Sequence, residues 1–226
     1  MKNITNYLAL GAVALGLTGA AQAVPTLKLI QGATTVIVSD NGLGVGPNAD
    51  SGGTDSSAVL GAVAFNGSVG AYVVNVSTGI TKPLQGSSAS PFMDLNSVDV
   101  GVGTLTLMFS ETGFTQLGSA LALIGGTSNG TISYSTYWSA SNALFATDNL
   151  LTTQSFGSGA FSGTRTGGPT SGQPYSLTQV VTITHNSLTT SSFDAQLTVP
   201  DSGSTIALLG AALATLGLIS RRRKVA

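Results

Sequence analysis

The sequence predicts an all-β fold, an antiparallel β-sandwich with a jelly-roll-like path, on three observations. Only 8% of the 226 residues are charged, whereas 42% are hydrophobic and 30 are glycine. Apolar and polar residues alternate with a period of two in several segments, which is typical of strands buried on one face. Clusters of Gly, Asn, Ser and Pro separate these segments, as turns do. Because cysteine is absent, the core alone must hold the fold.

About ten short strands are expected. The alternation is clearest in residues 104–109, 177–183 and 193–199. Further candidates are residues 26–30, 34–39, 58–65, 68–76, 119–124 and 131–138, of which 119–124 is ambiguous between helix and strand. The pairs Asn41-Gly42, Asn66-Gly67 and Asn129-Gly130 predict turns, the second of them a hairpin turn between residues 58–65 and 68–76. Long loops are expected at residues 40–57, 81–91 and 156–174.

The N-terminal residues 1–23 have the parts of a secretory signal peptide. Lys2 precedes an apolar stretch over residues 8–17, and Ala21 and Ala23 form a site of the A-x-A kind. We expect signal peptidase to cleave after Ala23. The alternative is an uncleaved anchor helix, but about ten apolar residues are too few to cross a bilayer.

The C-terminal residues 199–226 predict a membrane segment. The uncharged run from Ser204 to Ser220 is about 26 Å long as a helix, close to the hydrocarbon thickness of about 30 Å. A buried amphipathic helix is the alternative, but the run has no polar face. The basic residues that follow stay in the cytoplasm by the positive-inside rule, which places residues 24–198 outside. These basic residues are Arg221, Arg222, Arg223 and Lys224.

The same C-terminal segment resembles the PEP-CTERM sorting signals of Gram-negative bacteria. Those signals combine a Val-Pro-acidic motif, an apolar helix and an arginine cluster. Val199, Pro200, Asp201, Ser202 and Gly203 are similar to the VPDSG variant. The resemblance implies an exosortase as partner, which removes the helix and basic tail after transient anchoring in the inner membrane. It also implies association with the cell envelope and exopolysaccharide.

The charge of residues 24–198 argues against nucleic acid as a partner. This stretch holds three Lys or Arg and eight Asp or Glu residues. Binding to phosphates requires a basic face. Residues 24–198 are therefore expected to form one acidic, secreted β domain between the signal peptide (1–23) and the sorting signal (199–226).

Oxygen-bearing side chains in the first long loop are weak calcium candidates. Asp40, Asn48, Asp50 and Asp55 carry the ligand type that calcium prefers. Their spacing matches no EF-hand, and a loop rich in Gly, Asp and Asn is usually only a loop. We therefore expect no metal site, and no cofactor motif is present.

Catalytic residues are not expected. His185, the single histidine, lies at the end of a predicted strand, and nothing in the sequence pairs it with a nucleophile and a carboxylate. Glycoside hydrolysis requires two carboxylates around a sugar, and Glu111 has Asp94 and Asp99 as possible partners. Solvated strand ends explain these three residues more simply, so we expect no enzyme.

Two aromatic residues are candidates for ligand stacking. Tyr137 and Trp138 could stack on sugar rings, as in carbohydrate-binding β-sandwiches. However, Tyr134 and Trp138 share a strand face with Ile132, which favours packing in the core. The expected function is that of an exported cell-surface or matrix protein of structural or adhesive type. The alternatives are a carbohydrate-binding module and, less favoured, a secreted hydrolase.

Overall fold

The computed structural model of the protein describes residues 23–200 and residue 213. This part of the chain is all-β, and its strand pairs are antiparallel, as predicted. The strands are β1 (Thr26–Gln31), β2 (Thr34–Ser39), β3 (Ala62–Val69), β4 (Tyr72–Ile80), β5 (Phe92–Phe114), β6 (Ser119–Ser128), β7 (Thr131–Ser139), β8 (Asn149–Phe156), β9 (Gly159–Pro169) and β10 (Tyr175–Thr198). Two 3-10 turns, η1 (Asp40–Gly42) and η2 (Gly46–Asn48), follow β2.

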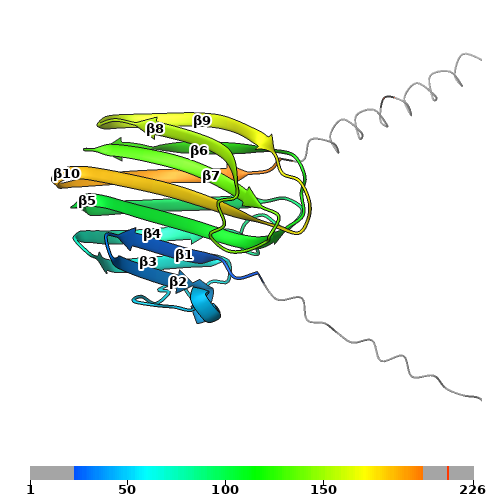
Figure 1. Cartoon of the computed structure of the whole chain (residues 1–226), viewed down its shortest axis with the longest axis horizontal. Coiled ribbons are helices and arrows are strands. Elements are labelled where there is room, and N and C mark those ends of the chain that lie inside the picture. The colour runs from blue at the N-terminus through cyan, green and yellow to red at the C-terminus, as the bar shows by residue number, and fades with distance from the viewer. Residues whose placement is uncertain (1–22, 201–212, 214–226) are drawn as a thin grey trace, which may run out of the picture.

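The two longest strands, β5 and β10, pair with each other along almost their whole length and belong to two layers at once. The first half of β5 pairs with β4 and its second half with β1. The first half of β10 pairs with β7 and its second half with β6. One layer therefore has the order β2-β1-β5-β10-β7-β8, and the other β3-β4-β5-β10-β6-β9 (Figure 1).

The layers meet along a line that we call the crease, which consists of residues 101–103, 129–130, 157–159 and 186–188. Here β5 and β10 bend, and the chain passes from β6 to β7 and from β8 to β9. The expectation of short strands is wrong for β5 and β10, because both continue through the crease: β5 bends at Gly101 and Gly103, and β10, which contains no glycine, bends at a register shift between His185 and Thr189. Gly103 has φ +92°, which L side chains rarely adopt. The hairpins β1–β2 and β3–β4 stay within one layer, unlike the crossings at the crease.

The core lies between the layers and is formed by the alternate residues that the sequence predicts. Leu105, Leu107 and Phe109 of β5 are fully buried. Hydrogen bonds also join the layers: the Tyr134 hydroxyl donates to the Gln196 carbonyl at 3.0 Å. Burying one large apolar side chain contributes about 1.5–3 kcal/mol, so apolar packing dominates the stability of this fold.

Two local predictions are wrong. The pair Asn66-Gly67 lies inside β3 at a register shift, and the hairpin turn is formed by Gly70 and Ala71, where Gly70 has φ +57°. Bulges accommodate an extra residue within a strand, so an Asn-Gly pair need not end it. The predicted loop at residues 156–174 contains strand β9, which pairs with β6. The ambiguous residues 119–124 belong to strand β6.

The glycines of β9 have a packing reason. A Cβ on Gly163 would lie 2.2 Å from Oε1 of Gln154, and one on Gly167 would lie 2.8 Å from the Leu151 carbonyl oxygen. Both neighbours belong to β8, the edge strand of the other layer. Glycine therefore lets the edges of the two layers approach closely. The prediction of a loop at residues 156–174 was wrong because these glycines resemble the composition of a turn.

The longer connections begin and end opposite the crease, at what we call the open end, although the middle of the first one runs back along β2 and β3. They are the loops 40–61, 81–91, 115–118, 140–148 and 170–174. The first described residues, which precede β1, and Pro200, which follows β10, also lie there (Figure 1).

Candidate functional site

The start of the predicted sorting motif coincides with the end of the fold. Val199 is 1% exposed, and its N–H donates to the Pro91 carbonyl at 3.3 Å. Pro200 is exposed, and its carbonyl oxygen lies near Gly118. The body therefore ends within the motif, with no linker between its last buried side chain and Pro200.

Ala23, the last residue of the predicted signal-peptidase site, lies at the same end of the sandwich. Ala23 is half-buried, 3.7 Å from the place that a Cβ on Gly113 would take. Ala21 and residues 201–203 lie outside the described residues, as do Arg221, Arg222, Arg223 and Lys224. Apart from Leu213, the predicted membrane segment lies outside them too. Within the described part of the chain, no helix is long and apolar enough to cross a membrane.

Comparison with protein families identifies the C-terminal segment. Residues 198–223 match the model of the VPDSG-CTERM motif. This segment is a PEP-CTERM-like sorting signal. The VPDSG-CTERM motif marks an exported protein that is sorted by an exosortase. No curated protein matches the chain.

The carboxylates of the first loop accept hydrogen bonds from the protein itself. Asp55 accepts from the backbone N–H groups of Asn41, Ser57 and Ala64 at 2.9 Å each. Asp50 accepts from the backbone N–H and the hydroxyl of Ser39. These bonds attach residues 40–57 to the ends of β2 and β3.

The other two calcium candidates, Asp40 and Asn48, do not complete a cluster of acidic side chains. Asp40 is buried and accepts from the backbone N–H of Gly61 at 2.7 Å, and Asn48 lies half-buried in η2. Among residues 23–200, no three His, Cys, Asp or Glu side chains come together as a potential metal site. The calcium hypothesis thus gains no support from the geometry of this loop.

His185 belongs to a buried network at the crease. Its Nδ1 lies 3.1 Å from the Gly101 carbonyl oxygen, and its Nε2 lies 2.7 Å from Oγ of Ser191. Because a carbonyl only accepts, Nδ1 donates to Gly101, and in the neutral ring Nε2 accepts from the Ser191 hydroxyl. Ser128 bonds to Ser191 at 2.9 Å, and the ring of Tyr72 stacks on the imidazole. Both imidazole nitrogens are therefore committed to structural hydrogen bonds.

Three acidic residues were considered for glycoside hydrolysis, and two of them do not lie at solvated strand ends. Glu111 and Asp99 are fully buried, so that expectation is wrong for both. Asp99 accepts from the Ser97 hydroxyl at 2.8 Å, and burial raises its pKa to about 7. Asp94 lies on the outer face of the β3-to-β9 layer, so the three carboxyl groups do not form one site.

Glu111 forms an internal ion pair beside a hollow at the open end. Nζ of Lys82 lies 2.6 Å from Oε1 of Glu111, and the Thr81 hydroxyl donates to Oε2 at 2.6 Å. Lys82 also donates to the Thr112 carbonyl and lies over the ring of Phe114. Burial raises the pKa of Glu111 to about 7 and lowers that of Lys82, while their attraction opposes both shifts. The hollow, of about 1070 Å³, reaches Ala23.

The two aromatic candidates lie on opposite faces of β7. Trp138 is half-buried against the core and meets the Tyr175 ring edge-on, with 6.3 Å between the ring centroids. Tyr134 and Ile132 are buried on the same face, as the alternation predicts. Tyr137 is half-buried on the outer face, where its register partner on β10 is Thr178. The two rings therefore do not form a common stacking platform.

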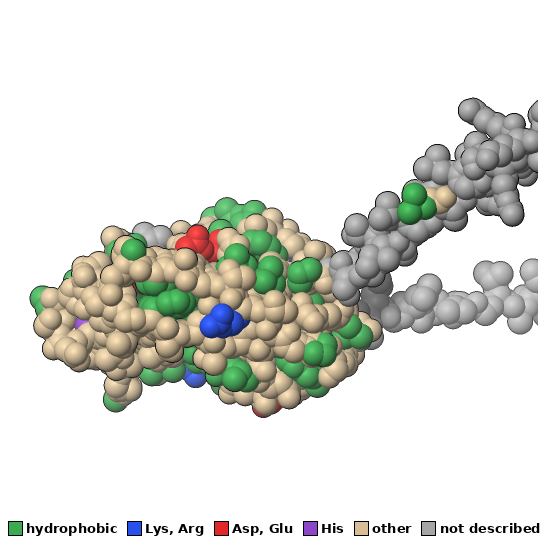
Figure 2. Space-filling model, turned by 90° about the horizontal axis from the view of Figure 1, so that it is seen from above, with side chains coloured by type: hydrophobic (Ala, Val, Ile, Leu, Met, Phe, Trp, Pro, Cys, Tyr) green, Lys and Arg blue, Asp and Glu red, His purple; other side chains and the backbone are tan. Residues whose placement is uncertain are grey.

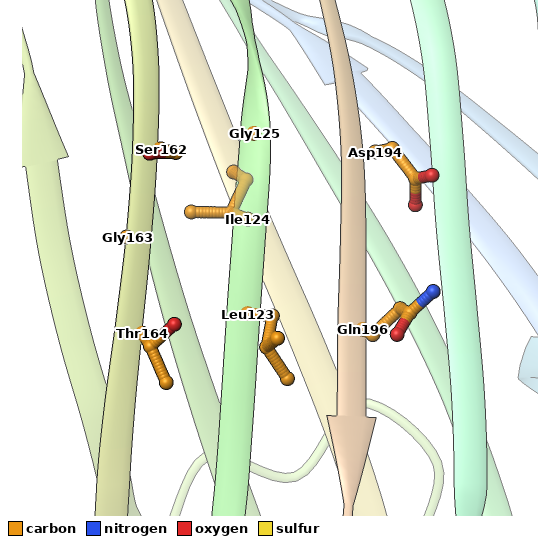
Figure 3. Close-up of a pocket in the computed structure, with 8 residues that line it drawn as sticks. All are labelled: Leu123, Ile124, Gly125, Ser162, Gly163, Thr164, Asp194 and Gln196. Carbon is orange, nitrogen blue, oxygen red and sulfur yellow. The ribbon is translucent and has the colours of Figure 1, made fainter.

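A shallow hollow on the outer face of the β3-to-β9 layer was not expected. It has a volume of about 540 Å³ and lies over β6, β9 and β10. In Figure 3 the side chains of Asp194 and Gln196 extend from the same side of β10. Asp94 of β5 hydrogen-bonds to Asp194, and its pKa is raised to about 7 by burial, by this bond and by the charge of Asp194. In residues 92–98 and 193–199 every second side chain faces outward. This alternation is the sequence signal that could have placed Asp94, Asp194 and Gln196 on one face.

Proposed function

We propose that the protein is a structural or adhesive component of the cell surface or extracellular matrix, released from its membrane tail by an exosortase. The position of Val199 carries this proposal. Because the core ends at Val199 and Pro200 is exposed, a cut after Pro200 would leave the sandwich intact. Proline lacks an N–H and so favours an extended, unpaired segment, which is the form that a protease needs.

A non-catalytic role is supported by the buried polar groups. His185 is held by Ser191 and the Gly101 carbonyl, and Glu111 is held by Lys82 and Thr81. Groups that already bond to their neighbours in this way are engaged in holding the fold together. The proposed role depends on display and rigidity, which the continuous strands β5 and β10 provide.

The decisive measurement is the intact mass of the mature protein from its native host. We expect an N-terminus at Val24 and a C-terminus between Val199 and Gly203. A mature mass that still includes residues 221–226 would contradict exosortase processing and indicate a stable tail anchor. A mass that includes residues 1–23 would contradict cleavage by signal peptidase.

Carbohydrate binding is the second candidate, and the hollow in Figure 3 favours it. Asp194 and Gln196 offer carboxylate and amide groups to neighbouring hydroxyls, and Leu123 adds an apolar contact. A glycan array should then show binding that Asp194→Ala and Gln196→Ala remove. Trp138→Ala is a poor probe, because loss of the contact with Tyr175 destabilises the core. Binding that survives both hollow variants would exclude this site.

A further inference from the structure

We infer that the open end is a membrane-docking surface, which rests on the outer leaflet of the bilayer that holds the uncleaved tail. This inference depends on the proposed function, because it assumes that the run beginning at Ser204 is inserted in the membrane. It adds a contact between the folded body and lipid that the sorting motif by itself does not require. The contact is made by loop side chains.

Large apolar side chains are exposed on the loops of the open end. We call them the apolar rim: Leu43, Val45, Val59, Leu60, Leu84 and Leu117. Single exposed apolar residues are common, but a group at one end of a domain indicates a contact surface. Figure 2 looks onto the side of the molecule where β8 and β9 lie, and there too hydrophobic side chains occur at the end from which the termini leave, with few charged groups.

Hydrogen bonds at Gly61 hold the two ends of loop 40–61 and the start of loop 81–91 together. The Gly61 N–H donates to Asp40 Oδ2 at 2.7 Å, and the Gly61 carbonyl accepts from the Thr81 N–H at 2.8 Å. A Cβ on Gly61 would lie 2.8 Å from the backbone nitrogen of Leu84. The loops that carry Leu43, Leu60 and Leu84 are thus fixed next to one another as one surface.

The length of chain after Pro200 brings this surface to the bilayer. Three residues separate Pro200 from Ser204, and the four residue-to-residue steps span at most about 14 Å when fully extended. The headgroup region on each side of a hydrocarbon core is about 5–7 Å thick. A body that ends at Val199 therefore has little space between the open end and the headgroups.

Charge does not oppose this contact at the rim. The carboxylates of Asp40 and Asp55 accept backbone N–H donors, and Lys82 is paired with Glu111. The described domain is acidic as a whole, so attraction to anionic lipid is not the source of docking. Apolar contact is the remaining source, and docking should be insensitive to salt and independent of anionic lipid.

The absence of cysteine allows a direct test with single labels. Val45→Cys, at the open end, and Leu188→Cys, at the crease, replace side chains that are 79% and 74% exposed. The full chain carrying either cysteine is labelled with nitrobenzoxadiazole and reconstituted into phosphatidylcholine vesicles containing a shallow nitroxide lipid. We expect several-fold stronger quenching at position 45 than at position 188. Equal quenching at the two positions would overturn the inference.

A longer tether separates docking from mere proximity. A flexible Gly/Ser spacer inserted between Gly203 and Ser204 frees the body to move away from the membrane. Docking predicts that a label at Leu84→Cys stays quenched in this variant, and that adding Val45→Asp and Leu60→Asp removes the quenching. Loss of quenching with the spacer alone would show that the tether, and not the rim, holds the open end at the membrane.

Insertion of the tail is measured separately in the same vesicles. Resistance of the full chain to alkaline carbonate extraction reports insertion, whatever the rim does. An inserted tail with equal quenching at positions 45 and 188 overturns docking and leaves the proposed function standing. An extractable tail contradicts the proposed anchoring itself. Unchanged thermal unfolding of the Val45→Asp and Leu60→Asp variant confirms that the body stays folded.

Discussion

The crease and the open end of the sandwich differ in the length of their connections and in how closely they pack. At the crease, strands pass between layers through two or three residues, and glycines allow contacts that a side chain would block. At the open end, three of the five longer loops (81–91, 140–148 and 170–174) line a hollow of about 1070 Å³, and loops 40–61, 81–91 and 115–118 expose apolar side chains. The crease is built for close packing, whereas the open end is built for contact with something outside the domain.

The largest expected effect is at the crease. A Cβ on Gly130 would lie 2.1 Å from the Thr184 carbonyl oxygen, which belongs to the backbone and cannot move aside easily. We expect Gly130→Ala to lower the free energy of unfolding by about 3 kcal/mol, measured by urea denaturation. Gly157→Ala, at the same crease with no atom within 4 Å, is the matched control and should be nearly neutral. Similar losses in both variants would contradict the packing explanation.

Buried carboxyl groups should make the stability of the crease and of the open end depend differently on pH. Asp99, next to the crease, has no cationic partner, whereas Glu111 at the open end has Lys82. The pKa of Asp99 rises from 3.8 unfolded to about 7 folded, so the folded state holds its proton longer. Stability therefore falls as pH rises from about 4 to 7, by up to about 1.4 kcal/mol per pH unit.

Two matched amide variants test this difference. Asp99→Asn should remove its share of the slope and raise stability at pH 8, because no charge is then buried. Glu111→Gln should lower stability by about 2 kcal/mol, because Lys82 loses its counter-ion. Urea denaturation at pH 5 and pH 8 measures both. A stabilising Glu111→Gln would show that the ion pair costs more than it contributes.

A smaller effect is expected from the hydroxyl network around the histidine. Ser191→Ala leaves Nε2 of His185 and the Ser128 hydroxyl without their partner, which should cost about 1–2 kcal/mol. Ser192→Ala, one residue on and facing outward, should cost less than about 0.5 kcal/mol. Thermal unfolding of the two variants at one pH gives the comparison. Equal costs would mean that the network adds no stability.

The smallest effect is local and confined to the open end. Asp55→Asn replaces a carboxylate that accepts three backbone N–H groups, including those of Asn41 and Ala64. We expect amide exchange at these positions to accelerate about tenfold with little change in global stability. Exchange at Gly130 serves as the reference and should stay unchanged. Acceleration at the crease as well would show that the two regions unfold together.

The sequence predicts the core well, because a period of two depends only on which face is buried. Leu105, Leu107 and Phe109 illustrate this. The crease was not predictable, since Gly101 and Gly103 have the composition of a turn while the strand continues through them. The burial of Glu111 also escaped prediction, because Thr81 and Lys82, which follow β4 in one layer, reach it across the sandwich from the opposite layer.

The candidate sites divide in the same way. The VPDSG-CTERM motif is a linear signal, so its residues could be recognised from order alone. The hollow near Asp94 and Asp194 depends on pairing between strands about 100 residues apart. Register over such a distance is set by the whole sheet and not by neighbouring residues. The apolar rim was invisible for the same reason, because its members come from separate loops.

The exit of the chain at Val199 has a mechanical consequence. Tension on the C-terminus would pull along β10, which pairs with β5 from residue 92 through residue 114 and with β6 and β7 on its other side. Such a load acts in shear on many hydrogen bonds at once instead of opening them one by one from an edge. A body held by this end in a matrix would resist extraction through its longest and most central strand.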